Sequence, residues 1–168
     1  MTEKTYAKIA WEAEKQILEG EGAILDATFG QKAHREKIVR LAERHRVPLV
    51  LIHCVASDET TEKRLAQREA EGKGVSDGRW EIYSKQKAAF EPINELPPAN
   101  CLKLNTELPR EQLARVVKSF CGRKSGKRGS SVGAPVRAAE GQRRAQPVLN
   151  PFAIILAVEA ELCCRVDL

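Results

Sequence analysis

The order of apolar and polar positions alternates between a helical and a strand-like pattern over the first 121 residues. Residues 3–19 repeat apolar side chains every three or four positions, from Tyr6 to Ile17, which is the spacing of an amphipathic helix. Residues 48–55 (PLVLIHCV) are apolar without a break, as is typical of a strand buried on both faces of a parallel sheet. Alternation of these two patterns predicts an α/β fold with a parallel sheet.

The other elements follow the same two patterns, and Gly and Pro residues punctuate them. Helices are predicted at residues 31–46, 58–71, 76–90 and 109–120, and strands at residues 23–25 and 101–104. Asp58 is the predicted N-cap of the third helix because it precedes the helical pattern. The elements therefore follow the order helix, strand, helix, strand, helix, helix, strand, helix.

The pattern changes at residue 122 and divides the chain into three parts. Residues 1–121 form the predicted folded domain. Residues 122–147 are rich in Gly, Ser, Arg and Ala without an apolar period, so a disordered basic linker is expected there. The apolar residues of the segment 150–164 (NPFAIILAVEAELCC) indicate an amphipathic helix, which gives a short C-terminal helix within residues 148–168.

The positive charge of the chain belongs to this linker. The net charge is +5, but residues 122–147 hold seven Lys and Arg residues against one Glu, so the remainder has a net charge of −1. Such a segment can contact nucleic acid through phosphate charge, although it has no interleaved aromatic residue for stacking on bases. A weak nucleic-acid contact is the most that this composition indicates.

Cysteine use and hydropathy indicate a cytoplasmic protein that is not inserted in a membrane. The five cysteines are odd in number and contain no C-x-x-C pair, which is typical of reduced thiols. The first residues have no apolar signal core, and no apolar stretch is long enough to span a bilayer.

The run GAILDATF places an acid and a hydroxyl at the end of a predicted strand. Ligands of parallel α/β proteins bind at the carboxyl ends of strands, so Asp26 and Thr28 are candidates for contact with a metal–phosphate complex. A carboxylate in this place can hold Mg²⁺. The alternative is that Asp26 only begins a turn.

Basic residues on the third predicted helix and beside it are candidate phosphate ligands. Arg64 and Arg68 are four positions apart and share a helical face, and guanidinium groups bind phosphate oxygens in pairs. Lys73 lies at the break after this helix, where it could close over a phosphate, and Arg35 could reach a substrate from the helix that follows Asp26. The alternative is a solvated, salt-bridged surface, with Glu62 among the acids that neutralise the arginines.

The three histidines lack the spacing of a metal site or of a nucleophilic triad. His53 lies within a predicted buried strand and is expected to be a core residue with its hydrogen bonds satisfied.

Four segments, in this order and spacing, resemble the P-loop kinase-like ATPases related to polynucleotide kinase and zeta toxin. They are YAKIAWEAEKQILEGEGAILDATF, AHREKIVRLAERHRVPLVLIHCVAS, EKRLAQRE and SDGRWEIYSKQKAAFEP. A similar branch is often fused to an aminoglycoside phosphotransferase-like domain. The resemblance implies a three-layer parallel sheet of P-loop NTPase type, with ATP and Mg²⁺ as cofactors. It also implies phosphoryl transfer to an unidentified hydroxyl of a small molecule or a nucleic acid.

By position, the resemblance gives roles to the candidate residues. Asp26 matches the metal-binding strand end, with Thr28 beside it. Arg64 and Arg68 match the catalytic arginines of the phosphate-clamping lid. Other lid positions that match in a structural role are Asp77, Tyr83 and Gln86.

The chain also departs from this family, since it contains no G-x-x-x-x-G-K-[ST] loop. The family's first strand, phosphate loop and second strand are expected before Thr5. We therefore expect the C-terminal part of a kinase, inactive alone, with an incomplete sheet that lacks its central strand and favours self-association. Two alternatives remain: a separate polypeptide supplies the loop, or the chain is a non-catalytic interaction protein with a basic tail that binds nucleic acid.

Overall fold

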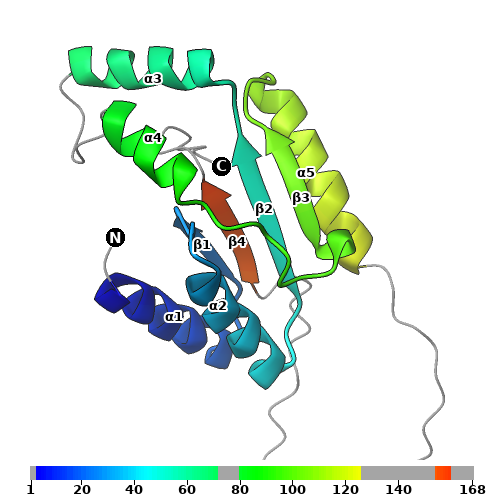
Figure 1. Cartoon of the computed structure of the whole chain (residues 1–168). Coiled ribbons are helices and arrows are strands. Elements are labelled where there is room, and N and C mark those ends of the chain that lie inside the picture. Colours follow the sequence, from blue (N-terminus) through cyan, green and yellow to red (C-terminus); the bar gives the residue numbers. More distant parts are fainter. Residues whose placement is uncertain (1–2, 72–79, 126–153, 160–168) are drawn as a thin grey trace, which may run out of the picture.

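The computed structural model describes residues 3–71, 80–125 and 154–159, which form a four-stranded parallel sheet with helices on both faces (Figure 1). The strands are β1 (Ala23–Ala27), β2 (Leu49–Val55), β3 (Cys101–Asn105) and β4 (Ile154–Glu159). The helices are α1 (Glu3–Leu18), α2 (Lys32–His45), α3 (Asp58–Ala70), α4 (Trp80–Ala88) and α5 (Arg110–Ser125), with a 3₁₀ turn η1 (Pro98–Asn100) before β3. The predicted parallel α/β class is confirmed.

The helices and strands predicted within residues 1–121 are present, with two changes. The helix predicted at residues 76–90 is described from Trp80 onward. The last helix continues to Ser125, five residues past its predicted end, so the helix includes the first residues of the predicted linker. Residues 126–147 of that linker lie outside the described residues.

The C-terminal helix is a wrong prediction for residues 154–159, which form β4. The strand order is β1-β4-β2-β3, so β4 lies between β1 and β2 and runs parallel to both. A short apolar run such as Ile-Ile-Leu-Ala-Val fits a buried strand as well as a buried helix. The flanking edges of β1 and β2 favour the strand over the helix, because they offer backbone hydrogen bonds on both sides. The strand β4 therefore fills the central gap that was expected in the sheet. The remaining residues of 148–168 are outside the described ranges.

Two hydrophobic cores hold the helices to the two faces of the sheet. The first joins α1 and α2 to β1, β4 and the start of β2, and the fully buried Phe29 and Ile38 belong to it. The second joins α5 to β2 and β3 through residues such as Leu104 and Phe120. The sheet is therefore the middle layer of three, as expected.

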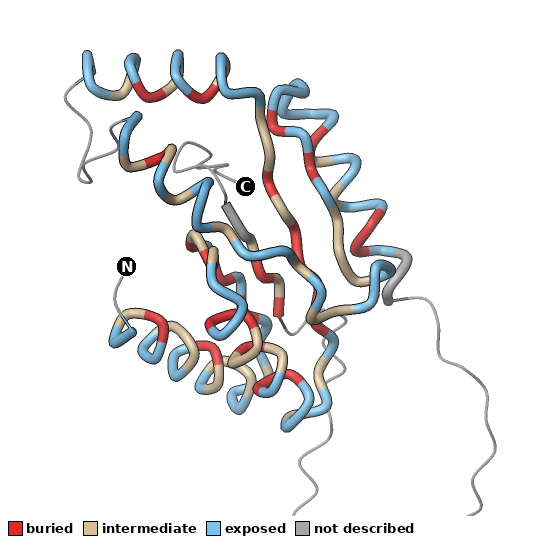
Figure 2. The backbone as a smooth tube through the Cα atoms, in the orientation of Figure 1, coloured by how far each residue is buried: buried red, intermediate tan, exposed pale blue. Residues whose placement is uncertain are grey.

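The remaining two helices, α3 and α4, lie beyond the carboxyl ends of the strands (Figure 1). Figure 2 shows the buried residues of α3 on the side that faces α4, while its outer side is exposed; the buried residues are Thr61 and Leu65. None of the described helices is both long and apolar enough to cross a membrane.

Candidate functional site

The carboxyl edge of the sheet gathers polar residues from three of the strands. Thr28 follows β1, Ser57 follows β2, and Thr106 and Glu107 follow β3. Helices α3 and α4 stand over this edge (Figure 1). Because the carboxyl ends of parallel strands are the usual ligand site of α/β proteins, this edge is the candidate site.

Asp26 is the fourth of the five residues of β1, and its side chain is exposed. Leu25 and Ala27 are buried against α1 and α2, so Asp26 and Ile24 face the opposite side of the sheet. The Cα atom of Asp26 is level with Ala157 of β4. The carboxylate is thus on the sheet and accessible to solvent, one residue before the strand ends.

The Thr28 hydroxyl is held by the first helix. Its Oγ1 atom lies 2.9 Å from the hydroxyl of Tyr6 on α1, and either oxygen can donate. The Tyr6 ring in turn stacks on His34, with ring centroids 3.8 Å apart. Thr28 therefore fixes the turn after β1 against α1 and is on the opposite side of the sheet from the Asp26 side chain.

Arg64 ties α3 to the end of β3. Its guanidinium donates to the Thr106 hydroxyl at 3.1 Å and to the Thr106 carbonyl at 2.8 Å. The Thr106 hydroxyl donates to the carbonyl of Val55 at 3.2 Å. This chain of hydrogen bonds sets the position of α3 over β2 and β3.

The strand order separates this arginine from the proposed metal ligand. Asp26 is level with Ala157 and Ile52, and β4 and β2 both lie between it and Thr106. Three interstrand spacings and four residues of rise put Thr106 roughly 20 Å from the Cα atom of Asp26. The two groups lie near one rim of the sheet, but the predicted convergence of Asp26 and Arg64 on one triphosphate is not present in this arrangement.

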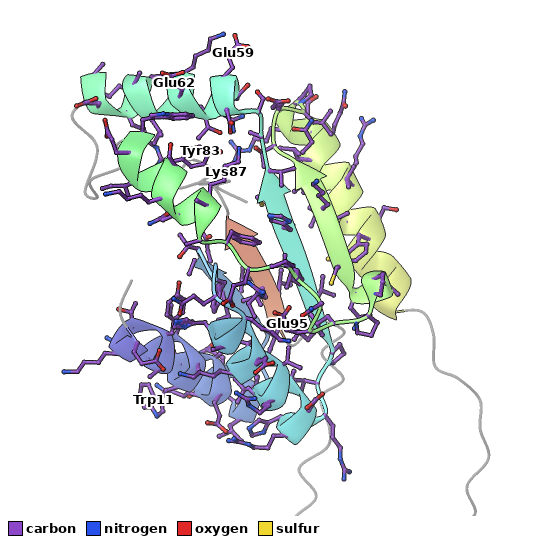
Figure 3. All side chains as sticks on the ribbon, in the orientation of Figure 1. Trp11, Glu59, Glu62, Tyr83, Lys87 and Glu95 are labelled. Carbon is purple, nitrogen blue, oxygen red and sulfur yellow. The ribbon has the colours of Figure 1, made fainter. Side chains whose placement is uncertain are left out.

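Arg68 lies one helical turn beyond Arg64 on the same face of α3 and is half-buried. Figure 3 shows Glu62 and Glu59 on the side of α3 away from α4, and Glu59 pairs with Lys63 at 2.6 Å. The charged outer side of α3 is therefore distinct from the side that carries the arginines. Lys73, the remaining candidate phosphate ligand, lies outside the described residues.

Arg35 has a structural role, which corrects its prediction as a substrate ligand. The residue is fully buried, and its side chain is 2.6 Å from the Glu95 carboxylate. Each guanidinium nitrogen donates to the protein; the other acceptors are the carbonyls of Phe29, Gly30, Glu91 and Pro92. The guanidinium therefore joins the segment after β1 to the segment after α4 and has no nitrogen directed to a ligand.

The Glu95 carboxyl remains ionised in this network. Burial alone would raise its pKa, but the hydrogen bond from Arg35 and the backbone N–H groups of Glu95 and Asn94 outweigh burial, and the net pKa is lowered. A buried charge is thereby matched by an opposite charge.

A capping network at the start of α3 was not predicted. Ser57, and not Asp58, is the N-cap, because its Oγ accepts from the backbone N–H of Thr60 at 3.2 Å. Glu107 accepts from the Ser57 hydroxyl and N–H and from the Thr60 hydroxyl, and these bonds lower its pKa from 4.5 to about 2. The sequence signal was present in the Ser-Asp-Glu-Thr start of the helix, but its acceptor comes from a distant loop.

Asp58 instead joins the two helices over the edge. It accepts a hydrogen bond from the Tyr83 hydroxyl at 2.9 Å and another from Lys87, both on α4. Figure 3 shows Tyr83 and Lys87 together between α4 and α3. Helices α3 and α4 are thus connected through Asp58.

His53 departs from the expectation of a satisfied core residue. Its ring stacks on Phe90, with centroids 5.1 Å apart and planes within 5° of parallel. Its Nε2 atom is buried and has no hydrogen-bond partner among the described residues. Burial, with smaller contributions from Lys103 and Arg35, lowers its pKa, so the ring is held neutral.

The acidic groups of this edge could bind Mg²⁺ together with a phosphate ligand, but they do not form a complete metal site by themselves. No group of three or more His, Cys, Asp or Glu side chains within the described ranges could hold a metal. Mg²⁺ commonly uses one or two carboxylates and completes its shell with water and substrate phosphates. The single exposed carboxylate of Asp26 is compatible with that mode.

The layers, the parallel strand order and the polar carboxyl edge define an α/β protein of P-loop NTPase type. A protein-family model described as AAA domain matches residues 1–93, more than half of the chain, and the chain belongs to this family. The match includes α1 to α4 and both Asp26 and the arginines of α3. Curated proteins and solved structures gave no match.

Proposed function

We propose that this chain carries the metal-binding and lid portion of an ATP-dependent kinase. The observation that supports the proposal is the AAA-domain match over residues 1–93, since it includes the strand end with Asp26 and the connected pair α3–α4. The acceptor in the proposal is a hydroxyl of a small molecule or of a nucleic acid. Transfer takes place at the carboxyl edge of the sheet.

In this proposal the acid and the basic residues have separate tasks. Asp26 orients the nucleotide through Mg²⁺, which when bound offsets the charge of the β- and γ-phosphates. Arg68 binds phosphate oxygens through paired N–H donors, and Lys73 adds a point charge. Arg64, through Thr106, sets the position of the helix that presents Arg68.

The proposal also requires a phosphate loop, and the printed sequence contains no G-x-x-x-x-G-K-[ST] run. The loop in the proposal is supplied by residues outside these 168, either encoded upstream or carried by a second polypeptide. Reading the DNA before the first codon distinguishes these two sources.

The test is to express the gene with its upstream codons and to measure Mg²⁺-dependent ATP binding and hydrolysis. Asp26→Asn is expected to abolish the Mg²⁺-dependent part of binding, and Arg68→Ala to slow hydrolysis by a factor on the order of 10² to 10³. Glu62→Gln, on the outer side of α3, is the matched control and should leave both unchanged. Wild-type rates in Asp26→Asn would disprove the site assignment.

The concentration of positive charge in residues 122–147 supports a second candidate, a non-catalytic protein that binds nucleic acid. Replacing the Lys and Arg residues of this segment by Gln, without changing its length, is expected to remove binding to DNA or RNA at low salt. Electrophoretic mobility shifts over a salt series measure this binding. Equal binding by the two chains would exclude this candidate.

A further inference from the structure

The inner strand β4 is the last of the described strands in the sequence. Its Cα atoms pair with five residues of β1 and with six residues of β2. Ile154 and Leu156 point into the core under α1 and α2 and are 1 % and 0 % exposed. The strand that comes last in the sequence therefore connects β1 on one side of the sheet to β2 and β3 on the other.

Without this strand, the sheet would have a gap that is one strand wide. Strands β1 and β2 do not pair with each other, and each offers β4 one row of backbone N–H and C=O groups. Strand edges of this kind are templates for another chain. The gap between β1 and β2, which we call the slot, accepts a parallel apolar strand whose alternate side chains face Leu25 and Leu51.

The connection between α5 and β4 allows more than one source for that strand. The chain leaves α5 at Ser125 and enters β4 at Ile154. Residues 126–153 can extend over at most roughly 90 Å, several times the width of this sheet. The same six residues can therefore reach the slot of their own chain or that of a neighbouring copy, with identical side-chain contacts in the two cases.

We propose that the slot is an interaction site for a second copy of this chain, in which each copy inserts its β4 between β1 and β2 of the other. The proposal does not depend on the proposed kinase function. Since the contacts are the same, protein concentration decides between the two forms, and exchange is favoured where the concentration of chains exceeds the effective concentration that the tether gives β4 at its own slot. Exchange takes place when concentrated chains fold together, and afterwards the closed sheets retain the partner.

The test uses the full chain with cysteines placed at a paired position on the open side of the sheet. Ile24 of β1 is level with Ile155 of β4, and both residues face away from α1. Neighbouring strands lie within disulfide distance. Cys163 and Cys164 are first replaced by Ser, and that background chain alone gives the level of oxidation that is due to the other native cysteines.

Two experiments are read together on non-reducing gels. The chain with both Ile24→Cys and Ile155→Cys is expected to form a disulfide within one chain. The Ile24→Cys chain and a larger tagged Ile155→Cys chain, unfolded and refolded together, are expected to form a mixed dimer. The yield of this dimer should rise about tenfold for a tenfold rise in protein concentration while it remains the minor form.

The matched control pairs the Ile155→Cys chain with Trp11→Cys, an exposed position on the side of α1 that points away from the sheet (Figure 3). A mixed dimer with Ile24→Cys that is no more abundant than this control would overturn the proposal. The absence of the disulfide in the doubly substituted chain would overturn it as well, since β4 would then not occupy the slot.

Discussion

Arg35 is a charged residue that belongs to the core. The sequence predicts a basic residue on the helix after Asp26, but its six protein contacts come from segments up to 60 positions away. Spacing along one helix carries no information about such partners. For this reason the sequence correctly predicts that Arg35 lies near the carboxyl edge of the sheet, but wrongly predicts that it binds substrate.

We predict that Arg35→Ala lowers the free energy of unfolding by about 3–5 kcal/mol, because it leaves the Glu95 carboxylate buried without its partner. Urea unfolding measures this change. Arg40→Ala, which removes an exposed pair with Glu36, is the control and should cost less than about 0.5 kcal/mol. Replacing both Arg35 and Glu95 by Met should recover only part of the loss, because the backbone carbonyls that accept from Arg35 would still lack a donor. A stable Arg35→Ala variant would contradict the structural role.

Glu107 makes the stability of the chain depend on pH. Its folded pKa is lowered to about 2, so the ionised form is favoured by folding. The stabilisation is complete above the ordinary value of 4.5 and is lost as the pH falls toward about 2. We predict that Glu107→Gln removes this part of the acid dependence in unfolding titrations; an unchanged acid profile would show that the capping network does not contribute to it.

Among elements, the helices and the strands β1, β2 and β3 could be predicted because their signals are local. Continuous apolar residues define β2, and Pro48 and the turn at Arg46 end the helix before it. The strand β4 could not be predicted, because its identity depends on two edges that come from residues distant in the sequence. The candidate site could be predicted only in part for the same reason. The end of β1 places Asp26, and the helix after β2 places Arg64, at the carboxyl edge of the sheet, but the distance between them depends on the strand order.

The residue that ends α2, Arg46, has a backbone conformation that is unfavourable for a residue with a side chain. Arg46 adopts a left-handed conformation with φ of 54°, and its N–H donates to the carbonyls of Ala42 and Glu43. Glycine takes this conformation without a steric cost. We predict that Arg46→Gly raises the free energy of unfolding by about 0.5–1 kcal/mol.

The matched control is Arg44→Gly, inside the last turn of the same helix, which is expected to lower stability by about 1 kcal/mol. Urea unfolding of the two variants separates the effect of the backbone conformation from loss of a positive charge. A loss of stability in both would show that the arginine side chain matters more than the turn.

At the scale of the whole molecule, β4 connects α1, α2 and β1 to β2, β3 and α5. Leu156 is fully buried at this junction. We predict that Leu156→Ala costs about 2–5 kcal/mol in urea unfolding. Ile24→Ala on β1, at a position 63 % exposed, should change stability by less than about 0.5 kcal/mol. Equal effects would mean that β4 does not hold the sheet together.

The position of β4 also has a consequence for synthesis. Strands β1, β2 and β3 leave the ribosome before Ile154 has been translated, so the nascent chain cannot assemble its final sheet during most of its production. During that interval the facing edges of β1 and β2 in the growing polypeptide have no partner strand. Chaperone binding or rapid completion of synthesis would then protect it from aggregation. A ribosome that stalls after residue 125 would release a product that contained all of the described helices but lacked β4.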